Sequence, residues 1–238
     1  MGGGMSYEGP VRSRRVWRLP VKLSVAVACL GILANVGGGI ALVAGFHTYS
    51  VSSSTMEPTL VPGELLVGES VSPAALRRGD VVLVDPTEWG MAGPVIRRVI
   101  GTGGDRVACC TSGHVTVDGQ PLDEPYATSA NGGLPGYAVT VPPGRVFLLG
   151  DNRSAAIDSR LYVVREQGTL PASAAATRVV WSSRGGFAAG GSKSLVIYLV
   201  LVTVGSLLLA LGVIALAVNL IRSARRSHPV ALPPPPGF

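Results

Sequence analysis

The chain has 238 residues and 47% of them are apolar, so it is long enough to bury a sizeable core. Its formal net charge is +6, which as a uniform basic surface would suggest a nucleic-acid partner. The cations instead gather beside two apolar segments. We therefore interpret the basic excess as a signal of membrane topology and expect no nucleic acid as a partner.

Two long uncharged segments divide the sequence. Residues 1–22 are basic and Gly-rich, and residues 23–46 form an uncharged stretch of 24 residues. Residues 194–221 form a second one of 28 residues, before a basic, Pro-rich tail over residues 222–238. A hydrocarbon core of about 30 Å needs about 20 helical residues. We predict two transmembrane helices, the first being longer than the apolar region of about 7–15 residues in a cleaved signal peptide.

The charges flanking these segments predict their orientation. Residues 1–22 and 222–238 together carry eight cations and one acid, whereas residues 47–193 carry twelve cations and thirteen acids. Cation-rich flanks stay on the cytoplasmic side of a membrane. We expect both termini in the cytoplasm and residues 47–193 outside it. The flanking cations are Arg12, Arg14, Arg15, Arg18, Lys22, Arg222, Arg225 and Arg226.

Residues 47–193 have the pattern of a mostly β domain. Short apolar and β-branched runs alternate with Gly, Pro and Asp, and helical periodicity is weak apart from a turn near residues 73–76. Asp118-Gly119 is typical of a hairpin turn, and residues 128–136 form a Gly-rich excursion. The expected strands are residues 64–67, 81–84, 95–100, 106–110, 115–117, 138–141, 145–149 and 179–181.

The three cysteines indicate neither a metal site nor a cofactor. Cys29 lies inside the first apolar segment and is expected to be an inert apolar side chain. Cys109 and Cys110 are adjacent, in a compartment that permits disulfides. A disulfide between neighbours is strained, so the sequence leaves open a bridge or two thiols in a strand. No Cys/His spacing is typical of a metal site, and we expect no cofactor.

Four motifs occur in order across residues 51–160, and together they resemble the signature boxes of bacterial type I signal peptidases. These enzymes are membrane-anchored proteases that cut signal peptides from exported proteins. The resemblance implies a signal-peptidase-like β-rich extracytoplasmic domain with two transmembrane helices, in a bacterial plasma membrane. It also implies signal peptides as ligands, beside membrane lipid. The motifs are Ser53-x-Thr55-Met56-Glu57-Pro58-Thr59, Arg78-Gly79-Asp80-Val81-Val82, Ile96-Arg97-Arg98-Val99-Ile100-Gly101 followed by Gly104-Asp105, and Gly150-Asp151-Asn152-Arg153 with Asp158-Ser159-Arg160.

The family's chemistry uses a serine nucleophile and a neutral lysine base, and its positions are substituted here. Thr55 occupies the nucleophile position, Arg97 the base position, and Ala156 the position of a serine that orients the lysine. An arginine keeps its proton near neutral pH and cannot act as the base. A shift by one residue gives Arg98, another arginine. Ser53 matches the family's side-chain donor to the oxyanion.

Two hypotheses follow from these substitutions. The first is a signal peptidase in which Thr55, or Ser54 in a shifted register, is activated by another base such as His47 or His114; His228 lies in the tail. The second, which the proton chemistry favours, is a non-catalytic relative that binds signal peptides or modulates an active signal peptidase paralogue. Structural roles are expected for Met56, Pro58, Asp151, Arg153, Asp158 and Arg160.

Overall fold

The structure is a computed structural model, and it describes residues 21–110, 113–187 and 192–226. The chain forms two compact units. One contains the helical residues 21–39 and 197–226, and the other is Ile40–Val196. Both predicted apolar segments are helices, α1 at Val21–Gly45 and α2 at Lys193–Arg226. Each is long and apolar enough to cross a membrane.

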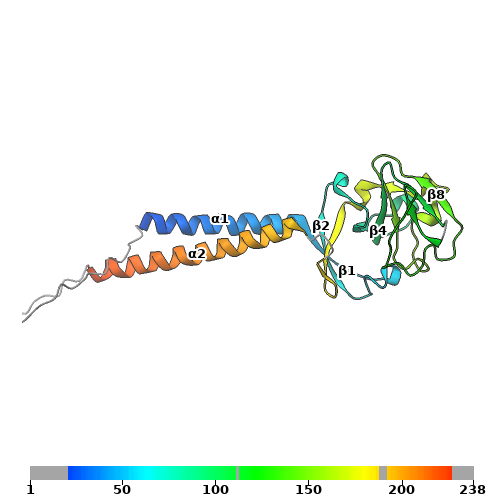
Figure 1. The fold of residues 1–238 in the computed structure, drawn as a ribbon. Helices are drawn as coiled ribbons and strands as arrows, with labels where there is room; N and C mark the ends of the chain where they lie inside the picture. The colour runs from blue at the N-terminus through cyan, green and yellow to red at the C-terminus, as the bar shows by residue number, and fades with distance from the viewer. Residues whose placement is uncertain (1–20, 111–112, 188–191, 227–238) are drawn as a thin grey trace, which may run out of the picture. The chain divides into compact units, whose positions relative to one another are not determined.

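The helices of the first unit run antiparallel, with their backbones in contact at small residues (Figure 1). A methyl group added at Gly31 would lie 2.5 Å from the Leu209 nitrogen, and one at Gly212 would lie 2.6 Å from the Ala28 nitrogen. Such close approach through small residues is typical of helix pairs in membranes. The Ser206 hydroxyl also donates a 3.0 Å hydrogen bond to Asn35 Oδ1 across the pair.

The second unit contains two antiparallel sheets. The larger has the strand order β1-β2-β11-β3-β4-β9-β10, with β12 paired to β11. Its strands are β1 (Phe46–Ser50), β2 (Leu65–Ser70), β3 (Val81–Val84), β4 (Val95–Thr102), β9 (Arg145–Leu149), β10 (Leu170–Pro171), β11 (Thr177–Ser182) and β12 (Gly186–Phe187).

The smaller sheet has the order β7-β6-β5-β8. Its strands are β5 (Arg106–Cys109), β6 (Thr116–Val117), β7 (Gln120–Pro121) and β8 (Tyr137–Thr140). Asp118 and Gly119 form the predicted turn between β6 and β7, both with positive φ. The short 3-10 helices are η1 (Ser54–Met56), η2 (Pro73–Ala75), η3 (Thr87–Trp89), η5 (Ser159–Tyr162), η6 (Glu166–Gly168) and η7 (Ala172–Ala175).

All eight predicted strands are present, so the mostly β fold is confirmed. The sequence did not predict β1, β7, β10 and β12. Three of these have two residues each, too few to show alternation. The fourth, β1, is an edge strand whose side chains are largely exposed, so it lacks the apolar pattern by which strands are recognised.

Candidate active site

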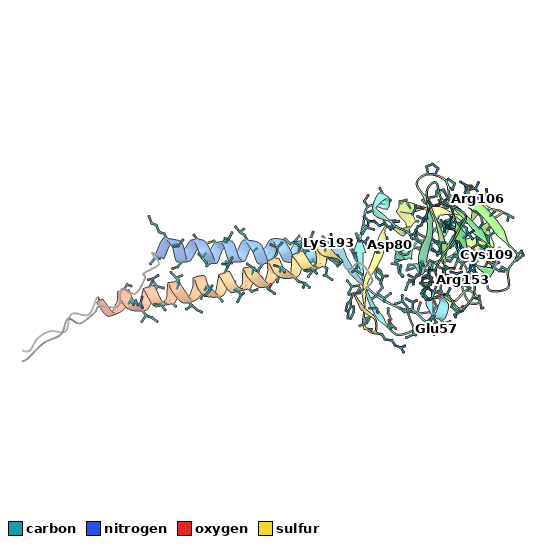
Figure 2. All side chains as sticks on the ribbon, viewed as in Figure 1. Glu57, Asp80, Arg106, Cys109, Arg153 and Lys193 are labelled. Carbon is teal, nitrogen blue, oxygen red and sulfur yellow. A yellow bond between two sulfur atoms is a disulfide. The ribbon has the colours of Figure 1, made fainter. Side chains whose placement is uncertain are left out.

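The turn that carries Thr55 is held in place by Met56, whose side chain is anchored in the core. The Met56 side chain is 1% exposed and packs with Val51, Leu60 and Leu66. Because η1 is a single turn, burying Met56 leaves Ser53 exposed and Thr55 half-buried at the surface. Pro58 is exposed beyond the end of η1, so it does not pack in the core. Glu57, which lies between Met56 and Pro58, is labelled in Figure 2.

The structure brings Ser53, Thr55 and Arg97 together. Ser53 Oγ lies 3.0 Å from Thr55 Oγ1, and Arg97 Nη1 donates a 3.0 Å hydrogen bond to the same Thr55 oxygen. Among the described residues, these two groups are the hydrogen-bond partners of the Thr55 hydroxyl. A general base must accept the hydroxyl proton, whereas the guanidinium donates to the hydroxyl oxygen.

Backbone carbonyls hold the rest of the Arg97 guanidinium. Nε and Nη2 donate to Ile157 O at 3.1 and 2.7 Å, and Nη1 donates to Ile96 O at 2.5 Å. Burial lowers the pKa of Arg97; the Asp158 charge raises it and the Arg160 charge lowers it, leaving the pKa below its ordinary value. An arginine starts from a pKa above about 12, so this side chain keeps its proton near neutral pH.

The last motif closes against the Thr55 backbone. Asn152 donates from its backbone nitrogen to Thr55 O at 3.1 Å and from Nδ2 to Ser54 O at 3.2 Å. A methyl group added at Gly150 would lie 2.3 Å from the Ala156 Cβ and 2.7 Å from Thr55 O. Gly150 therefore allows the close approach that places Ala156, itself 6% exposed, beside the Thr55 turn.

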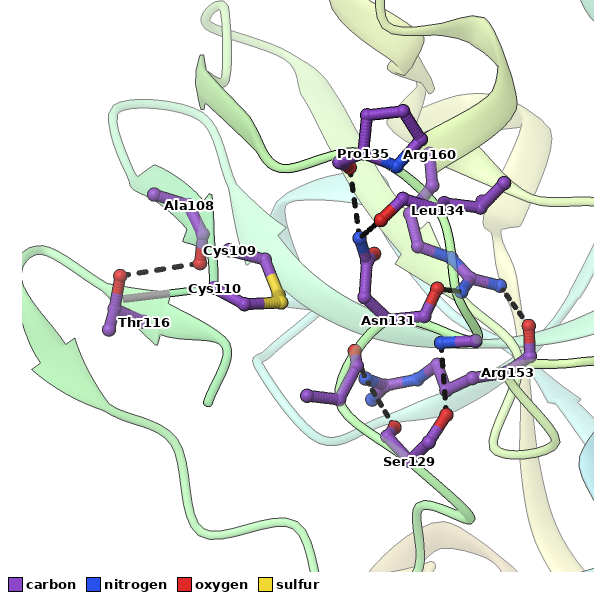
Figure 3. The surroundings of a disulfide bond; sticks show 12 residues. Ala108, Cys109, Cys110, Thr116, Ser129, Asn131, Leu134, Pro135, Arg153 and Arg160 are labelled. Carbon is purple, nitrogen blue, oxygen red and sulfur yellow. Dashed lines mark hydrogen bonds between the residues drawn. A yellow bond between two sulfur atoms is a disulfide. The ribbon is translucent and has the colours of Figure 1, made fainter. Parts of the chain in front are cut away.

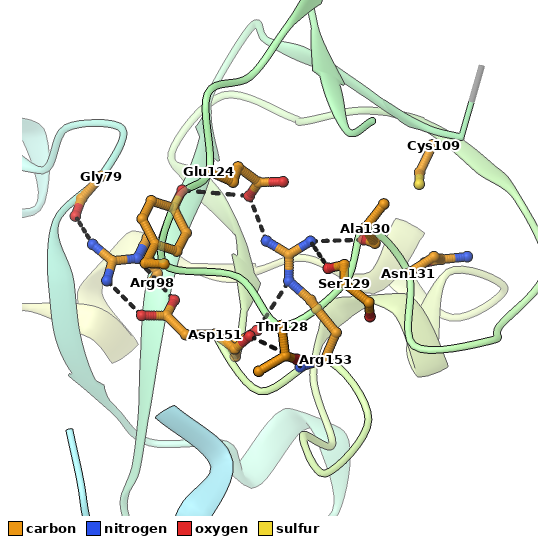
Figure 4. Close-up of polar contacts among 12 residues, drawn as sticks. Gly79, Arg98, Cys109, Glu124, Thr128, Ser129, Ala130, Asn131, Asp151 and Arg153 are labelled. Atoms are coloured by element: carbon orange, nitrogen blue, oxygen red, sulfur yellow. Dashed lines mark hydrogen bonds and ion pairs between the residues drawn. The ribbon is translucent and has the colours of Figure 1, made fainter. Parts of the chain in front are cut away.

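Arg98, the neighbour of Arg97 on β4, is engaged elsewhere (Figure 4). Its Nε and Nη2 donate to the Asp151 carboxylate at 2.9 and 2.5 Å, and Nη1 donates to Gly79 O at 3.0 Å. Its guanidinium also lies 3.8 Å from the centre of the Tyr126 ring. The expected alternative register, with Arg98 at the base position, is not the one that contacts Thr55.

Two further arginines of the last motif are also paired with carboxylates. Arg153 contacts Glu124, and Arg160 donates from Nε to Asp158 Oδ1 at 2.8 Å. Both guanidinium groups also donate to backbone carbonyls of residues 129–131, in the Gly-rich excursion (Figure 3). Cys109 and Cys110, which Figure 3 also shows, are joined as a disulfide.

The other candidate groups lie outside the Thr55 hydrogen bonds. His47 is exposed on β1, His114 is exposed beside β6, and neither contacts the Thr55 hydroxyl. His228 falls outside the described residues. Ser54 contributes its carbonyl to Asn152, and its hydroxyl makes no hydrogen bond with the described residues. Trp89, in η3, is buried at 5% exposed and stacks on Tyr162.

Sequence reasoning missed the roles of four residues in shaping the site. Ile157 contributes only its backbone carbonyl, which no side-chain pattern could reveal. Thr59 donates to Asp151 Oδ2 at 2.5 Å, linking the first motif to the last. Asn152 and Gly150 belonged to a recognised motif, but their role in holding the Thr55 turn depends on contacts over about a hundred residues of chain.

Comparison with known proteins identifies the family. The family model "Signal peptidase, peptidase S26" matches residues 22–183. Signal peptidase I of Mycobacterium tuberculosis is 28% identical over 205 residues, covering 66% of this chain and 70% of its own. Signal peptidase I of Leptolyngbya laminosa is 33% identical over 154 residues, covering 56% and 72%. The chain belongs to the signal peptidase family, peptidase S26, whose type I members are membrane-anchored.

A crystal structure of a signal peptidase I from Enterococcus faecalis is also similar. It is 24% identical, and the match covers 50% of this chain and all of that one, with a TM-score of 0.35.

Proposed function

We propose that this chain binds the signal peptides of exported preproteins without cleaving them by serine–lysine chemistry. The observation that carries the proposal is the hydrogen bond from Arg97 Nη1 to Thr55 Oγ1. A nucleophilic hydroxyl needs a neutral base that accepts its proton. Thr55 instead faces a cation that donates to its oxygen, which makes that oxygen a poorer nucleophile.

The strand β1 supports peptide binding at this site. It is an edge strand, paired only with β2 among the described strands, and it ends at Ser50, five residues before Thr55. Its free edge offers backbone donors and acceptors to an extended peptide, a common mode of peptide recognition. The proposed ligand is therefore an extended segment with small residues near Thr55, bound partly as an added strand.

Cleavage and binding should be measured on the full-length protein in detergent micelles. We expect a labelled signal peptide to bind, and a preprotein to stay intact under conditions in which an active signal peptidase cleaves it. The triple variant Thr55→Ser, Arg97→Lys, Ala156→Ser restores the family's groups and should recover cleavage. Cleavage by the natural protein that disappears in Thr55→Ala would refute the proposal.

For the membrane topology, we propose that both termini are cytoplasmic and that residues 47–193 face outwards from a bacterial plasma membrane. The support is the unequal distribution of cations around the two helices. A cysteine replacing Asp118, in the exposed turn between β6 and β7, should react with a membrane-impermeant thiol reagent in intact cells. Arg222→Cys should react only after permeabilisation, and the reverse pattern would overturn the orientation.

A further inference from the structure

Arg97 differs from every other buried arginine of the described residues. Four arginines are 9% exposed or less: Arg97, Arg98, Arg153 and Arg160. Arg98 pairs with Asp151, Arg153 with Glu124, and Arg160 with Asp158. Arg97, at 2% exposed, has no carboxylate within ion-pair distance in the described part of the chain. Buried charges are ordinarily paired, so the missing partner requires an explanation.

The candidate counter-charge for Arg97 within the protein, Asp158, already accepts hydrogen bonds from other groups. Asp158 attracts Arg97 electrostatically, but both of its oxygens are occupied. Oδ1 accepts from the backbone nitrogen and the Nε of Arg160. Oδ2 accepts from the backbone nitrogen of Gly150 and from Arg160 Nη2. The positive charge of Arg97 is therefore left without a counter-charge at the end of the side chain that faces Thr55.

This end of the guanidinium lies behind a pair of surface hydroxyls. Nη1 contacts Thr55 Oγ1, and Thr55 Oγ1 contacts the exposed Ser53 Oγ. Because Arg97 already donates to Thr55, each hydroxyl can turn its proton towards a ligand or its neighbour. While Ser53 and Thr55 are hydrogen-bonded to each other, one of the two hydroxyl protons remains free, so a ligand at this surface meets one hydroxyl donor with a fixed cation behind it. That arrangement stabilises an anion, whereas the peptide bond of an uncut substrate is neutral.

We propose that the site recognises the free C-terminal carboxylate of a peptide ending at the signal-peptide cleavage position, in preference to the uncut chain. The inference rests on the proposed function, because it assumes that a peptide is bound along the free edge of β1. Capture of a terminal carboxylate by clustered donors is an established mode of peptide recognition. The chain would then retain a signal peptide that another peptidase has already released.

A matched pair of peptides tests the carboxylate directly. Both are fluorescently labelled and end in Ala-x-Ala, the pattern of a cleavage site; one has a free carboxylate and the other a C-terminal amide. Fluorescence anisotropy on the full-length protein in micelles gives both dissociation constants. We expect the carboxylate peptide to bind about 10- to 100-fold more tightly, the range of a charge-assisted hydrogen bond.

Variants assign the preference to Arg97. Arg97→Gln should reduce the ratio of the two dissociation constants to about 1. Arg97→Lys supplies a charge only while its buried amine is protonated, so it should retain part of the preference at low pH and lose it as the pH rises. The control Arg106→Gln removes the same charge from an exposed residue of β5 (Figure 2) and should leave the ratio unchanged. If Arg97→Gln does not fold, the ratio in the natural protein and in Arg97→Lys still decides the question.

The outcomes separate this inference from the proposed function. Equal binding of the two peptides would overturn carboxylate recognition while leaving signal-peptide binding intact. Failure of both peptides to bind would overturn the two proposals together. N-acetylalanine that competes as strongly as the whole peptide would assign the site to small carboxylates and refute a peptide-terminus site.

Discussion

Arg97 and Arg98 are consecutive on β4 and both are buried, yet their side chains lie in two different regions of the domain. Arg98 belongs to a closed network in which buried guanidinium groups meet buried carboxylates, together with Arg153 and Arg160. Arg97 belongs to the Thr55 surface, where it meets hydroxyl and carbonyl oxygens. The same residue type, on opposite faces of one strand, therefore stabilises the fold in one place and leaves charge available to a ligand in the other.

The paired network also holds the family's motifs together. Arg98 joins the third motif to Asp151 of the last, Thr59 joins the first to the same carboxylate, and Arg78 joins the second motif to Asp105 at the end of the third. The three contacts span 27 to 92 residues of sequence. The motifs that identified the family are therefore largely the parts of one structural unit, and only Ser53, Thr55 and Arg97 face the proposed ligand.

The largest predicted effect separates the two regions by the same substitution at neighbouring positions. Arg98→Gln leaves Asp151, which is fully buried, without its cation, and breaking a buried pair in this way costs about 3–5 kcal/mol. Arg97→Gln abandons no carboxylate and should cost only about 1–2 kcal/mol for its weakened carbonyl contacts. Urea unfolding of the full-length protein in micelles, followed by tryptophan fluorescence, measures both free energies. Equal losses of unfolding free energy would contradict the distinction between a carboxylate-paired Arg98 and an Arg97 without such a partner.

The different roles of Arg97 and Arg98 could not be predicted from the sequence. The apolar alternation predicted eight of the twelve strands that the structure describes, and motif order placed Arg97 opposite Thr55. No local pattern could tell which of two adjacent arginines has a carboxylate, since the partner Asp151 lies 53 residues away. The exposed edge strand β1 was missed for a related reason: its residues are positioned by pairing with β2 and not by burial of their own side chains.

A smaller effect is expected where the two regions meet, at Gly150. Gly150→Ala places a methyl group 2.3 Å from the Ala156 Cβ and 2.7 Å from Thr55 O, so backbone or side chain must shift. Overpacking of this kind costs about 1–3 kcal/mol, and the same shift should weaken peptide binding by displacing Thr55. In the control Gly185→Ala, the methyl group meets only the Ser182 hydroxyl at 3.0 Å. Unfolding and peptide anisotropy measure the two consequences, and an unaffected affinity would contradict the link between Gly150 and the site.

The smallest effect concerns an ion pair of the network that reaches the surface. The hydrogen bond from Arg78 holds the pKa of Asp105 below its ordinary value, although burial opposes it. A carboxylate with a lowered folded-state pKa stabilises the protein above its unfolded pKa of about 3.9, and that stability is lost as the pH falls through the folded value. Because the Arg78 side chain is 41% exposed, the contribution should be below about 1 kcal/mol. Arg78→Gln should therefore lower stability slightly at pH 6 and flatten its decline below pH about 4, measured by urea unfolding. If the loss of unfolding free energy below pH about 4 is unchanged in Arg78→Gln, the acid sensitivity arises from the buried ion pairs and not from this contact.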